Sequence, residues 1–515
     1  NYGSDLDAYN VAVGYNAGTS MTTGIKNVIM GGLAGDALTA GGENVAIGYS
    51  ALSTEDAHGK NVAIGAYALN TLDAGAYAYN VSIGHNSSYA MSTGIENVFI
   101  GAFAGDAYTT GGQSVGIGYE ALSTEDDHGG STAIGYRALK MQNSGAANKN
   151  VAVGFDAGLS VTTGTQNTLV GGHAGDALTT GGDNVAIGYL ALSAEDGHGR
   201  NIAIGKGALQ SQNAGAEAYN IAIGYNTGVN VTTGNENILI GGNTGVDLTT
   251  GIRNVAVGHN ALGSEDAHGY NVAIGNRALQ SQDAGADAYN VAVGSNAGQS
   301  VTTGTSNVLV GAQAGDALTT GGGNIAVGLG ALGTEDTSSK SVAIGTNALN
   351  AQNSDVSNAY NTALGHDAGL SISTGTYNVV MGGKAGDTLT TGSHNIAIGY
   401  HALGTEDGDG RNVAIGHEAL VVQNVGQAGY NVSMGYEAGH DVSDGKQNTI
   451  IGGLAGDALT TGDNNIIIGY NAAASAVGVD NEITLGDSNI SAFRCADQSI
   501  AALSDGRDKS EVEES

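Results

Sequence analysis

A five-residue phrase, seen clearly in Asn184-Val185-Ala186-Ile187-Gly188, recurs along the chain from Asn10 to a last copy that begins at Glu482. Successive copies begin at spacings of 17, 17, 17 and 19, so four phrases form a 70-residue super-repeat, lengthened once to 71 near Asp355. Seven super-repeats, with 28 phrases, fill the chain. A period this regular is typical of stacked units that each need a neighbour to bury one face. The sequence therefore predicts one solenoid instead of several globular domains.

Each phrase has the pattern of a short β-strand. Its second and fourth residues are Val, Ile, Thr, Leu or Met, its third is usually Ala, and its fifth is Gly. This alternation matches the two-residue period of a strand, and a Gly every few residues excludes a helix. We predict an all-β fold, a parallel β-roll or β-solenoid of 28 short coils. We expect the linking segments, such as residues 161–163 before Gly164, to hold a second short strand.

The first residue of the phrase is usually Asn, with Ser114, Ser131, Ser341 and Glu482 as the exceptions. Stacked side-chain amides can donate to and accept from the coils above and below. We therefore expect these residues to form a structural ladder, represented by Asn10, Asn27, Asn44, Asn61, Asn184 and Asn254.

The third residue of the phrase is large and apolar in the second phrase of every super-repeat. These residues are Ile29, Phe99, Leu169, Leu239, Leu309, Val380 and Ile450. If the second and fourth residues fill the interior of the coil, the third points outward, where such a row would be an unusual exposed stripe. We therefore predict that this row is the interface of a homotrimer. The alternative is that a second strand of the same coil covers it.

The composition excludes several classes of function. A formal net charge of −33 disfavours nucleic acid and anionic membranes as partners, because both are bound through clustered Lys and Arg. The acidic loops are expected to keep the assembly soluble. A single Cys excludes an intrachain disulfide framework, and no apolar run is long enough for membrane insertion. Because the first residue is Asn, we expect the sequence to be a fragment or a processed product.

The longest of the four spacings gives a longer loop that often ends in Tyr before Asn, and the two additional residues should protrude. The exposed loop aromatics expected here are Tyr79, Tyr219, Tyr289, Tyr360 and Tyr430. Two roles are open for them, a cap over the edge of the coil or a contact with saccharide or protein.

A second kind of loop brings Glu, Asp and His together, as in Glu55, Asp56 and His58. Its copies lie four coils apart, about 19 Å at ~4.8 Å per coil, so two copies cannot share an ion. The His is also replaced by Ser338 and Asp409 in later copies. We therefore expect solvated loops, no metal and no cofactor. Every carboxylate-rich loop is a repeated copy, so no unique carboxylate pair for glycan hydrolysis is present, and we expect no enzyme activity on a substrate.

The Asn/Ser-Val-Ala-Ile-Gly phrase resembles the repeat in the heads of YadA-type trimeric adhesins. The resemblance covers residues 10–486, and it implies a β-roll whose coils stack within each of three chains. The repeat of that family is shorter than the spacing of the phrases here, so the loops of this chain are extended. We assign residues 1–486 to the repeat shaft.

After Leu485 and Gly486 the pattern stops, and residues 487–503 form a junction. The segment Ser504-Asp505-Gly506-Arg507-Asp508-Lys509 resembles the self-cleavage point of the S74-type intramolecular chaperone domain found behind bacteriophage tail fibres. The resemblance implies that Ser504 is the nucleophile of one self-cleavage and that Lys509 activates it. Residues 504–515 would then be the start of that domain. An unrelated charged tail is the alternative.

Together these features predict the shaft of a virion fibre, such as a phage tail fibre, that serves host attachment outside the cell. Its expected partners are two further copies of the chain, virion tail proteins and a glycan or protein receptor on the host surface. The alternative function is the head of a trimeric autotransporter-type bacterial surface adhesin.

Overall fold

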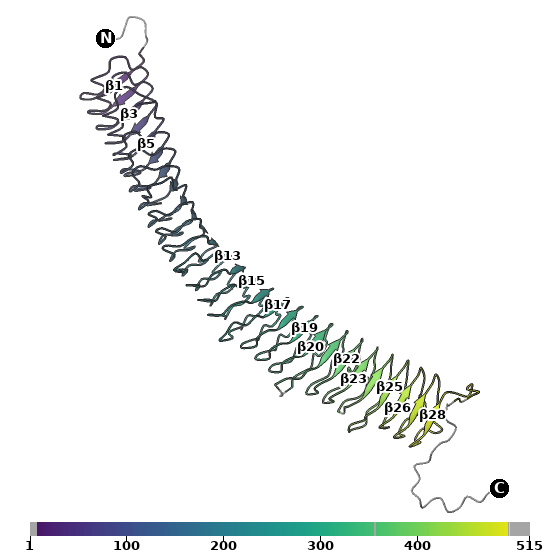
Figure 1. Ribbon diagram of the computed structural model, residues 1–515. Helices are drawn as coiled ribbons and strands as arrows, with labels where there is room; N and C mark the ends of the chain where they lie inside the picture. The colour runs from purple at the N-terminus through teal and green to yellow at the C-terminus, as the bar shows by residue number, and fades with distance from the viewer. Residues whose placement is uncertain (1–7, 355–356, 409, 493, 495–515) are drawn as a thin grey trace, which may run out of the picture. The chain divides into compact units, whose positions relative to one another are not determined.

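A computed structural model describes residues 8–354, 357–408, 410–492 and 494, in two compact units that meet in sequence after Tyr377. Unit 1 ends at Tyr377 and unit 2 begins at Asn378. Within the described residues all regular secondary structure is β-strand, which confirms the all-β prediction (Figure 1). The described residues therefore contain no helix of the length and apolar character that crossing a bilayer requires.

Unit 1 contains the strands of the first 21 phrases. They are β1 (Val11–Val13), β2 (Val28–Met30), β3 (Val45–Ile47), β4 (Val62–Ile64), β5 (Val81–Ile83), β6 (Val98–Ile100), β7 (Val115–Ile117), β8 (Thr132–Ile134), β9 (Val151–Val153), β10 (Thr168–Val170), β11 (Val185–Ile187), β12 (Ile202–Ile204), β13 (Ile221–Ile223), β14 (Ile238–Ile240), β15 (Val255–Val257), β16 (Val272–Ile274), β17 (Val291–Val293), β18 (Val308–Val310), β19 (Ile325–Val327), β20 (Val342–Ile344) and β21 (Thr362–Leu364). Unit 2 contains β22 (Val379–Met381), β23 (Ile396–Ile398), β24 (Val413–Ile415), β25 (Val432–Met434), β26 (Thr449–Ile451), β27 (Ile466–Ile468) and β28 (Ile483–Leu485).

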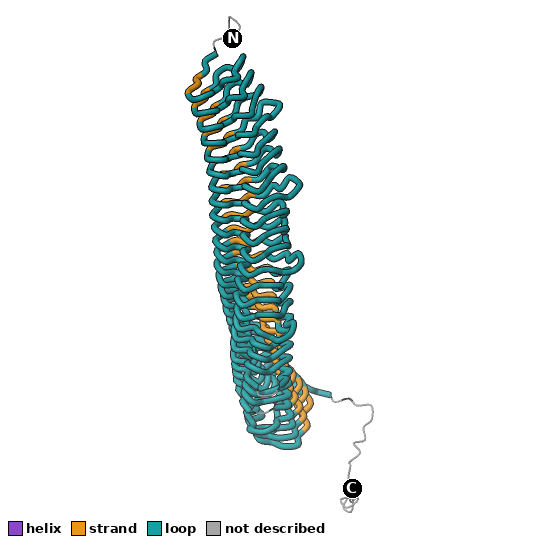
Figure 2. The backbone as a smooth tube through the Cα atoms, turned by 90° about the vertical axis from the view of Figure 1, so that its left-hand side faces the viewer, coloured by secondary structure: helices purple, strands orange, loops and turns teal. Residues whose placement is uncertain are grey.

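Within each unit every strand pairs in parallel with the strand of the next coil, and equivalent phrase positions face each other. Between β11 and β12, for example, Ala186 pairs with Ala203. Backbone hydrogen bonds continue this pairing around the turns, as in the 3.0 Å bond from Leu192 N–H to the carbonyl of Ala208. Within each unit, Figure 2 shows the resulting stack of coils, with the strands in one row and loops around the rest of each turn. The predicted parallel β-solenoid is therefore present.

The prediction for the two faces of the strand is wrong. In every coil but the first and the last, the third phrase residue points into the coil and is buried, whereas the second and fourth residues lie on the outside, half-buried or exposed. The predicted interface residues are therefore buried inside the single chain, with at most 1% of their surface exposed. They are Ile29, Phe99, Leu169, Leu239, Leu309, Val380 and Ile450.

Packing inside the coil explains why the second phrase of each super-repeat carries a large third residue. Four residues after the Gly of the phrase, the third and fourth coils place a buried Leu, as at Leu192, whereas the first and second coils place Gly158 and Gly175. A methyl group added to Gly158 would lie 2.7 Å from Leu169, and one added to Gly175 would lie 2.9 Å from it. Leu169 therefore fills the space that the two glycines leave open, as close packing requires.

The expected second strand is absent from the described coils. Residues 161–163 form a bend without strand geometry, although Thr162 N–H donates to the carbonyl of Thr179 in the next coil at 2.8 Å. The remainder of each coil uses left-handed backbone instead, and many of these residues are not Gly. Leu192 has φ 52° and is fully buried, as are Leu209 and Leu262 at φ 48° and 51°. A buried Leu offsets the cost of this conformation through the apolar area that it removes from water.

The asparagines of the phrase form a buried ladder of hydrogen bonds. At Asn254 the backbone N–H donates to the Oδ1 of Asn237 at 2.9 Å, and the Asn254 Oδ1 accepts from the N–H of Asn271 at 3.0 Å. The Asn254 Nδ2 also donates to the carbonyl of His268 at 3.1 Å. Each side chain therefore joins backbone groups of neighbouring coils at a position where water does not reach.

Replacing Asn254 with Ala leaves the Asn271 N–H and the His268 carbonyl without partners inside the coil. We expect this variant to lose about 1–3 kcal/mol in the free energy of unfolding, measured by chemical denaturation. Asn254→Ser should lose less, because the hydroxyl of Ser131 accepts the N–H of Asn150 in the equivalent place. Equal stability of the wild type and Asn254→Ala would contradict a supporting role for the ladder.

The Gly that ends each strand approaches the next coil closely. Gly188 has φ 140°, and a methyl group added to it would lie 2.5 Å from the carbonyl carbon of Gly205. We expect Gly188→Ala to lower the free energy of unfolding by about 2 kcal/mol or more. Gly197→Ala is the matched control, because Ala57 and Ala267 occupy the equivalent loop position. A similar loss in both variants would show that Gly188 has no special role.

Candidate binding surfaces

The outer face of the strands is an apolar surface in both units. We call it the strand face, and it consists of the second and fourth residues of the phrases. In unit 1 it exposes 37% of Ile238, 36% of Val308 and 38% of Ile325. In unit 2 it exposes Ile466 and Ile468 to a similar extent. These positions were expected in the interior, so the apolar surface available for association lies on the side of each strand opposite to the predicted one.

A second surface of unit 1 is a continuous row of aromatic rings, one from each of nine successive coils. The members of this aromatic row are Tyr49, Tyr67, His85, Phe103, Tyr119, Tyr136, Phe155, His173 and Tyr189. Neighbouring ring centroids lie between 5.1 Å and 6.3 Å apart. Tyr119, Tyr136 and Phe155 stack with interplanar angles of 13° and 8°. Half of the Phe155 and Tyr189 surfaces are exposed, so the row is open to a ligand.

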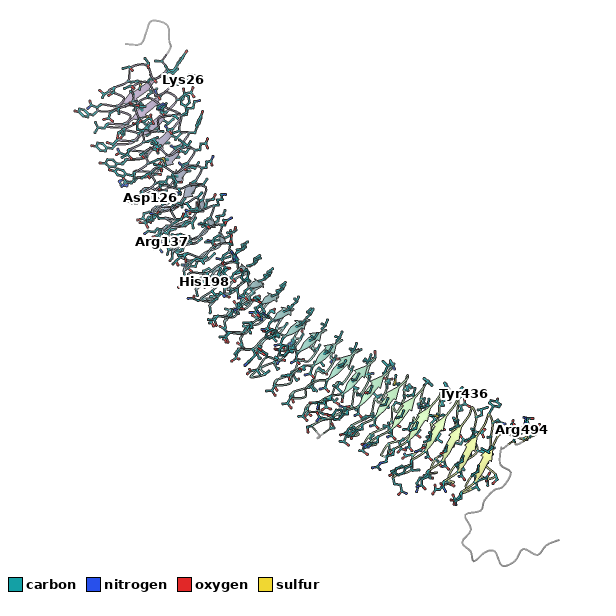
Figure 3. All side chains as sticks on the ribbon, viewed as in Figure 1. Lys26, Asp126, Arg137, His198, Tyr436 and Arg494 are labelled. Carbon is teal, nitrogen blue, oxygen red and sulfur yellow. The ribbon has the colours of Figure 1, made fainter. Side chains whose placement is uncertain are left out.

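A shorter row of the same kind occurs in unit 2. Tyr400, His417 and Tyr436 follow the phrase in three successive coils, with centroids 5.4 Å and 5.2 Å apart. Figure 3 shows Tyr436 at the edge of this unit. Neither row was predicted from the sequence. The signal that could have revealed them is an aromatic residue or His one or two positions after the Gly of many phrases.

The tyrosines expected in the long loops are exposed, with fractions from 41% at Tyr360 to 56% at Tyr289. Four of the five lie beside a cation, as where Lys60 Nζ is 5.2 Å from the ring centroid of Tyr79. Because a cation over an aromatic ring is attracted to its face, these pairs hold the loops against the coil. Tyr289 instead stacks on Tyr270, with centroids 5.0 Å apart. The other cation pairs are Arg200 with Tyr219, Lys340 with Tyr360 and Arg411 with Tyr430.

The Glu-Asp-His loops are only partly solvated, which corrects the expectation from the sequence. Their Glu side chain is fully buried in six super-repeats, at Glu55, Glu125, Glu195, Glu265, Glu335 and Glu406. The carboxylate accepts the backbone N–H three residues later, at 3.1 Å from His198 in the third copy and 2.7 Å from Ser338 in the fifth. Figure 3 labels His198 in this row of loops. The buried Glu therefore holds the two ends of this loop segment together through a hydrogen bond on its inner side.

Buried amides complete the environment of several of these carboxylates. Gln142 Nε2 donates to Glu125 Oε2 at 3.0 Å, and Gln142 Oε1 accepts from Asn150 Nδ2 at 2.9 Å. The loop is thereby joined to the asparagine ladder. Despite these bonds, burial raises the pKa of each carboxyl above its ordinary value, because the charged form loses hydration. The groups affected are Glu55, Glu125, Glu195, Glu265 and Glu335.

The loops also bring together side chains that can bind a metal. In the first four super-repeats Glu, Asp and His offer ligand atoms within 4.8 Å of one another, and Asp283 joins the fourth of these groups. From the sequence no metal was expected here, because later copies lack the His and because copies lie too far apart to share an ion. The second of these reasons does not apply to a site built within one copy.

Ser504 and Lys509, the proposed self-cleavage pair, lie outside the described residues, as does most of the junction. Comparisons with known proteins found no family model, no curated protein and no solved structure that matches this chain.

The buried carboxyls predict a pH dependence of stability. A carboxyl whose pKa is higher in the folded than in the unfolded chain stabilises the fold at low pH, and this contribution is lost as pH rises through the folded pKa. We therefore expect the melting temperature, measured with a chelator present, to rise when pH falls from 7 to about 5. Glu335→Gln should weaken this dependence, whereas Glu96→Gln, at an exposed position, should not. Identical pH profiles for Glu335→Gln and the wild type would refute the assignment.

Proposed function

We propose that the chain is the structural shaft of a multi-chain extracellular fibre, a virion tail fibre, in which copies associate through the strand face. The observation that carries this proposal is the exposed apolar surface repeated from coil to coil. Contiguous apolar surface of this kind is rare on soluble monomers and is typical of a contact with another chain. A second copy of this chain repeats the same spacing of phrases, so its strand face matches the same rows of side chains.

The negative charge of the chain favours association through the strand face over association through the loops. The chain has 49 acidic and only 16 basic residues. Like charges on the loops repel one another and oppose contact between the loops of two chains. The strand face instead carries apolar residues, whose removal from water is favourable. We propose three chains, a number taken from the resemblance to trimeric heads and chaperone-bearing fibres.

Attachment to a host surface is the second part of the proposal. The aromatic row of unit 1 supports it, because rings that are partly exposed and held in a line offer large, rigid contact area at small entropic cost. The long-loop tyrosines contribute less to such a contact, since most of their rings already lie beside Lys or Arg. Ligands of the aromatic row would be a glycan or a protein.

Two substitutions on the strand face test the assembly. Leu239 and Leu309, which belong to the interface row predicted from the sequence, are unsuitable for this test, because they are buried and replacing them would unfold the coil. We expect the wild-type chain to have the mass of three chains in light scattering coupled to size exclusion. Replacing Ile238 and Val308 together with Glu should give single chains with an unchanged circular dichroism spectrum, because charge is excluded from an apolar contact.

The matched control replaces the same two residues with Thr, which occupies the equivalent position at Thr132 and Thr168. This control should keep the mass of the wild type. A wild-type chain that is monomeric across the concentration range would overturn the proposal. So would a Glu double variant that still assembles.

A further inference from the structure

The loop after β15 contains a cluster of ligand-type side chains that the proposed function does not use. Glu265, Asp266 and His268 belong to this loop, and Asp283 occupies the position of Asp266 in the next coil. One ligand atom from each of the four lies within 4.8 Å of the others. The cluster thus joins two successive coils, with one imidazole and three carboxylates facing a common point.

Two atoms of this cluster are buried without a hydrogen-bond partner. The Glu265 side chain is fully buried, and its Oε2 has no partner. His268 Nδ1 is also buried without one, 3.4 Å from Glu265 Oε1. An uncompensated buried carboxylate oxygen is costly, and a cation beside it removes that cost. The separation of 3.4 Å fits two ligands about 2.0–2.1 Å from one tetrahedral metal ion.

The equivalent loop one super-repeat later, which contains Glu335, can be compared with the loop of Glu265. There Ser338 replaces the His and Asn353 replaces Asp283. Both oxygens of Glu335 have partners in that loop, because Oε1 accepts from Ser338 N–H at 2.7 Å and Oε2 accepts from Gln352 Nε2 at 2.8 Å. In the loop of Glu265 the equivalent Gln282 makes no such bond, and its Nε2 has no partner. In the fifth loop, where Ser338 and Asn353 replace two of the ligand-type residues, the fold therefore satisfies the buried Glu335 by hydrogen bonds alone.

We propose that Glu265, Asp266, His268 and Asp283 bind one divalent transition-metal ion of the Zn²⁺ class. The imidazole favours such an ion over Ca²⁺ or Mg²⁺, which prefer oxygen ligands alone. The ion would link the coils of β15 and β16 through their loops and neutralise part of the local negative charge. The first three super-repeats place only three such ligands together, so they form weaker sites.

Cobalt(II) is the probe for this site, because tetrahedral Co²⁺ absorbs visible light strongly and Zn²⁺ then displaces it. Titrating Co²⁺ into the full chain, after chelator treatment, should give one tight equivalent with this absorption. Asp283→Asn and His268→Ser should each weaken Co²⁺ and Zn²⁺ binding by about tenfold or more, since loss of a ligand costs at least as much as loss of a supporting residue.

Both replacement residues occur at equivalent places in the chain, at Asn213 and Ser338, so the variants are compatible with the fold. Glu335→Gln is the control and should bind Co²⁺ as the wild type does. A chain that shows no tetrahedral Co²⁺ absorption would overturn the proposal. It would also be overturned if His268→Ser or Asp283→Asn bound both metals with wild-type affinity. Neither result bears on assembly through the strand face, which is measured by mass.

Discussion

Hydrogen bonding between coils is the constraint on which the rest of this structure depends. A strand of three residues is too short to be stable alone, and within each unit every strand pairs in register with the next. The turns follow the same rule, since many of their N–H groups also donate to the neighbouring coil. Because backbone groups that leave water need a partner, no coil can change its path without changing those on either side. Conformations that are costly in isolation, such as Leu192 at positive φ, are therefore held in place by the stack.

The interior is unusual because polar side chains alternate with apolar ones along the stack. Seven residues after the Gly of the phrase, four successive coils bury Val161, Leu178, Glu195 and Gln212 at one position. The first two pack near the large third residue of the second strand, and the last two belong to the polar network below the loops. From the second to the sixth super-repeat, two coils with an apolar residue at this position are thus followed by one coil with Glu and one with Gln.

Much of this fold could be predicted from the sequence, because the strand, the coil length and the asparagine ladder each depend on a pattern local to the phrase. Which face of each strand points into the coil could not be predicted. Val and Ile at the second and fourth positions suit a buried or an exposed face of a β-strand, and only the glycines at 158 and 175 reveal which side has room for Leu169. The burial of the Glu was not predicted for a related reason. A Glu beside Asp and His is expected to be exposed to solvent unless its hydrogen-bond partners in the next coil are known. The long-loop tyrosines were placed correctly on the surface because loop length alone decides their exposure.

The alternation of interior chemistry also restricts how a chain of this kind can change in length. Removing a single coil would separate residues that need a particular neighbour, leaving for example Glu125 without Gln142, or Leu169 without Gly158. Removing or adding four coils together restores every layer to its proper neighbour. Recombination is therefore expected to change the length of such a chain in steps of one whole super-repeat. The packing of the interior thus decides which lengths are possible.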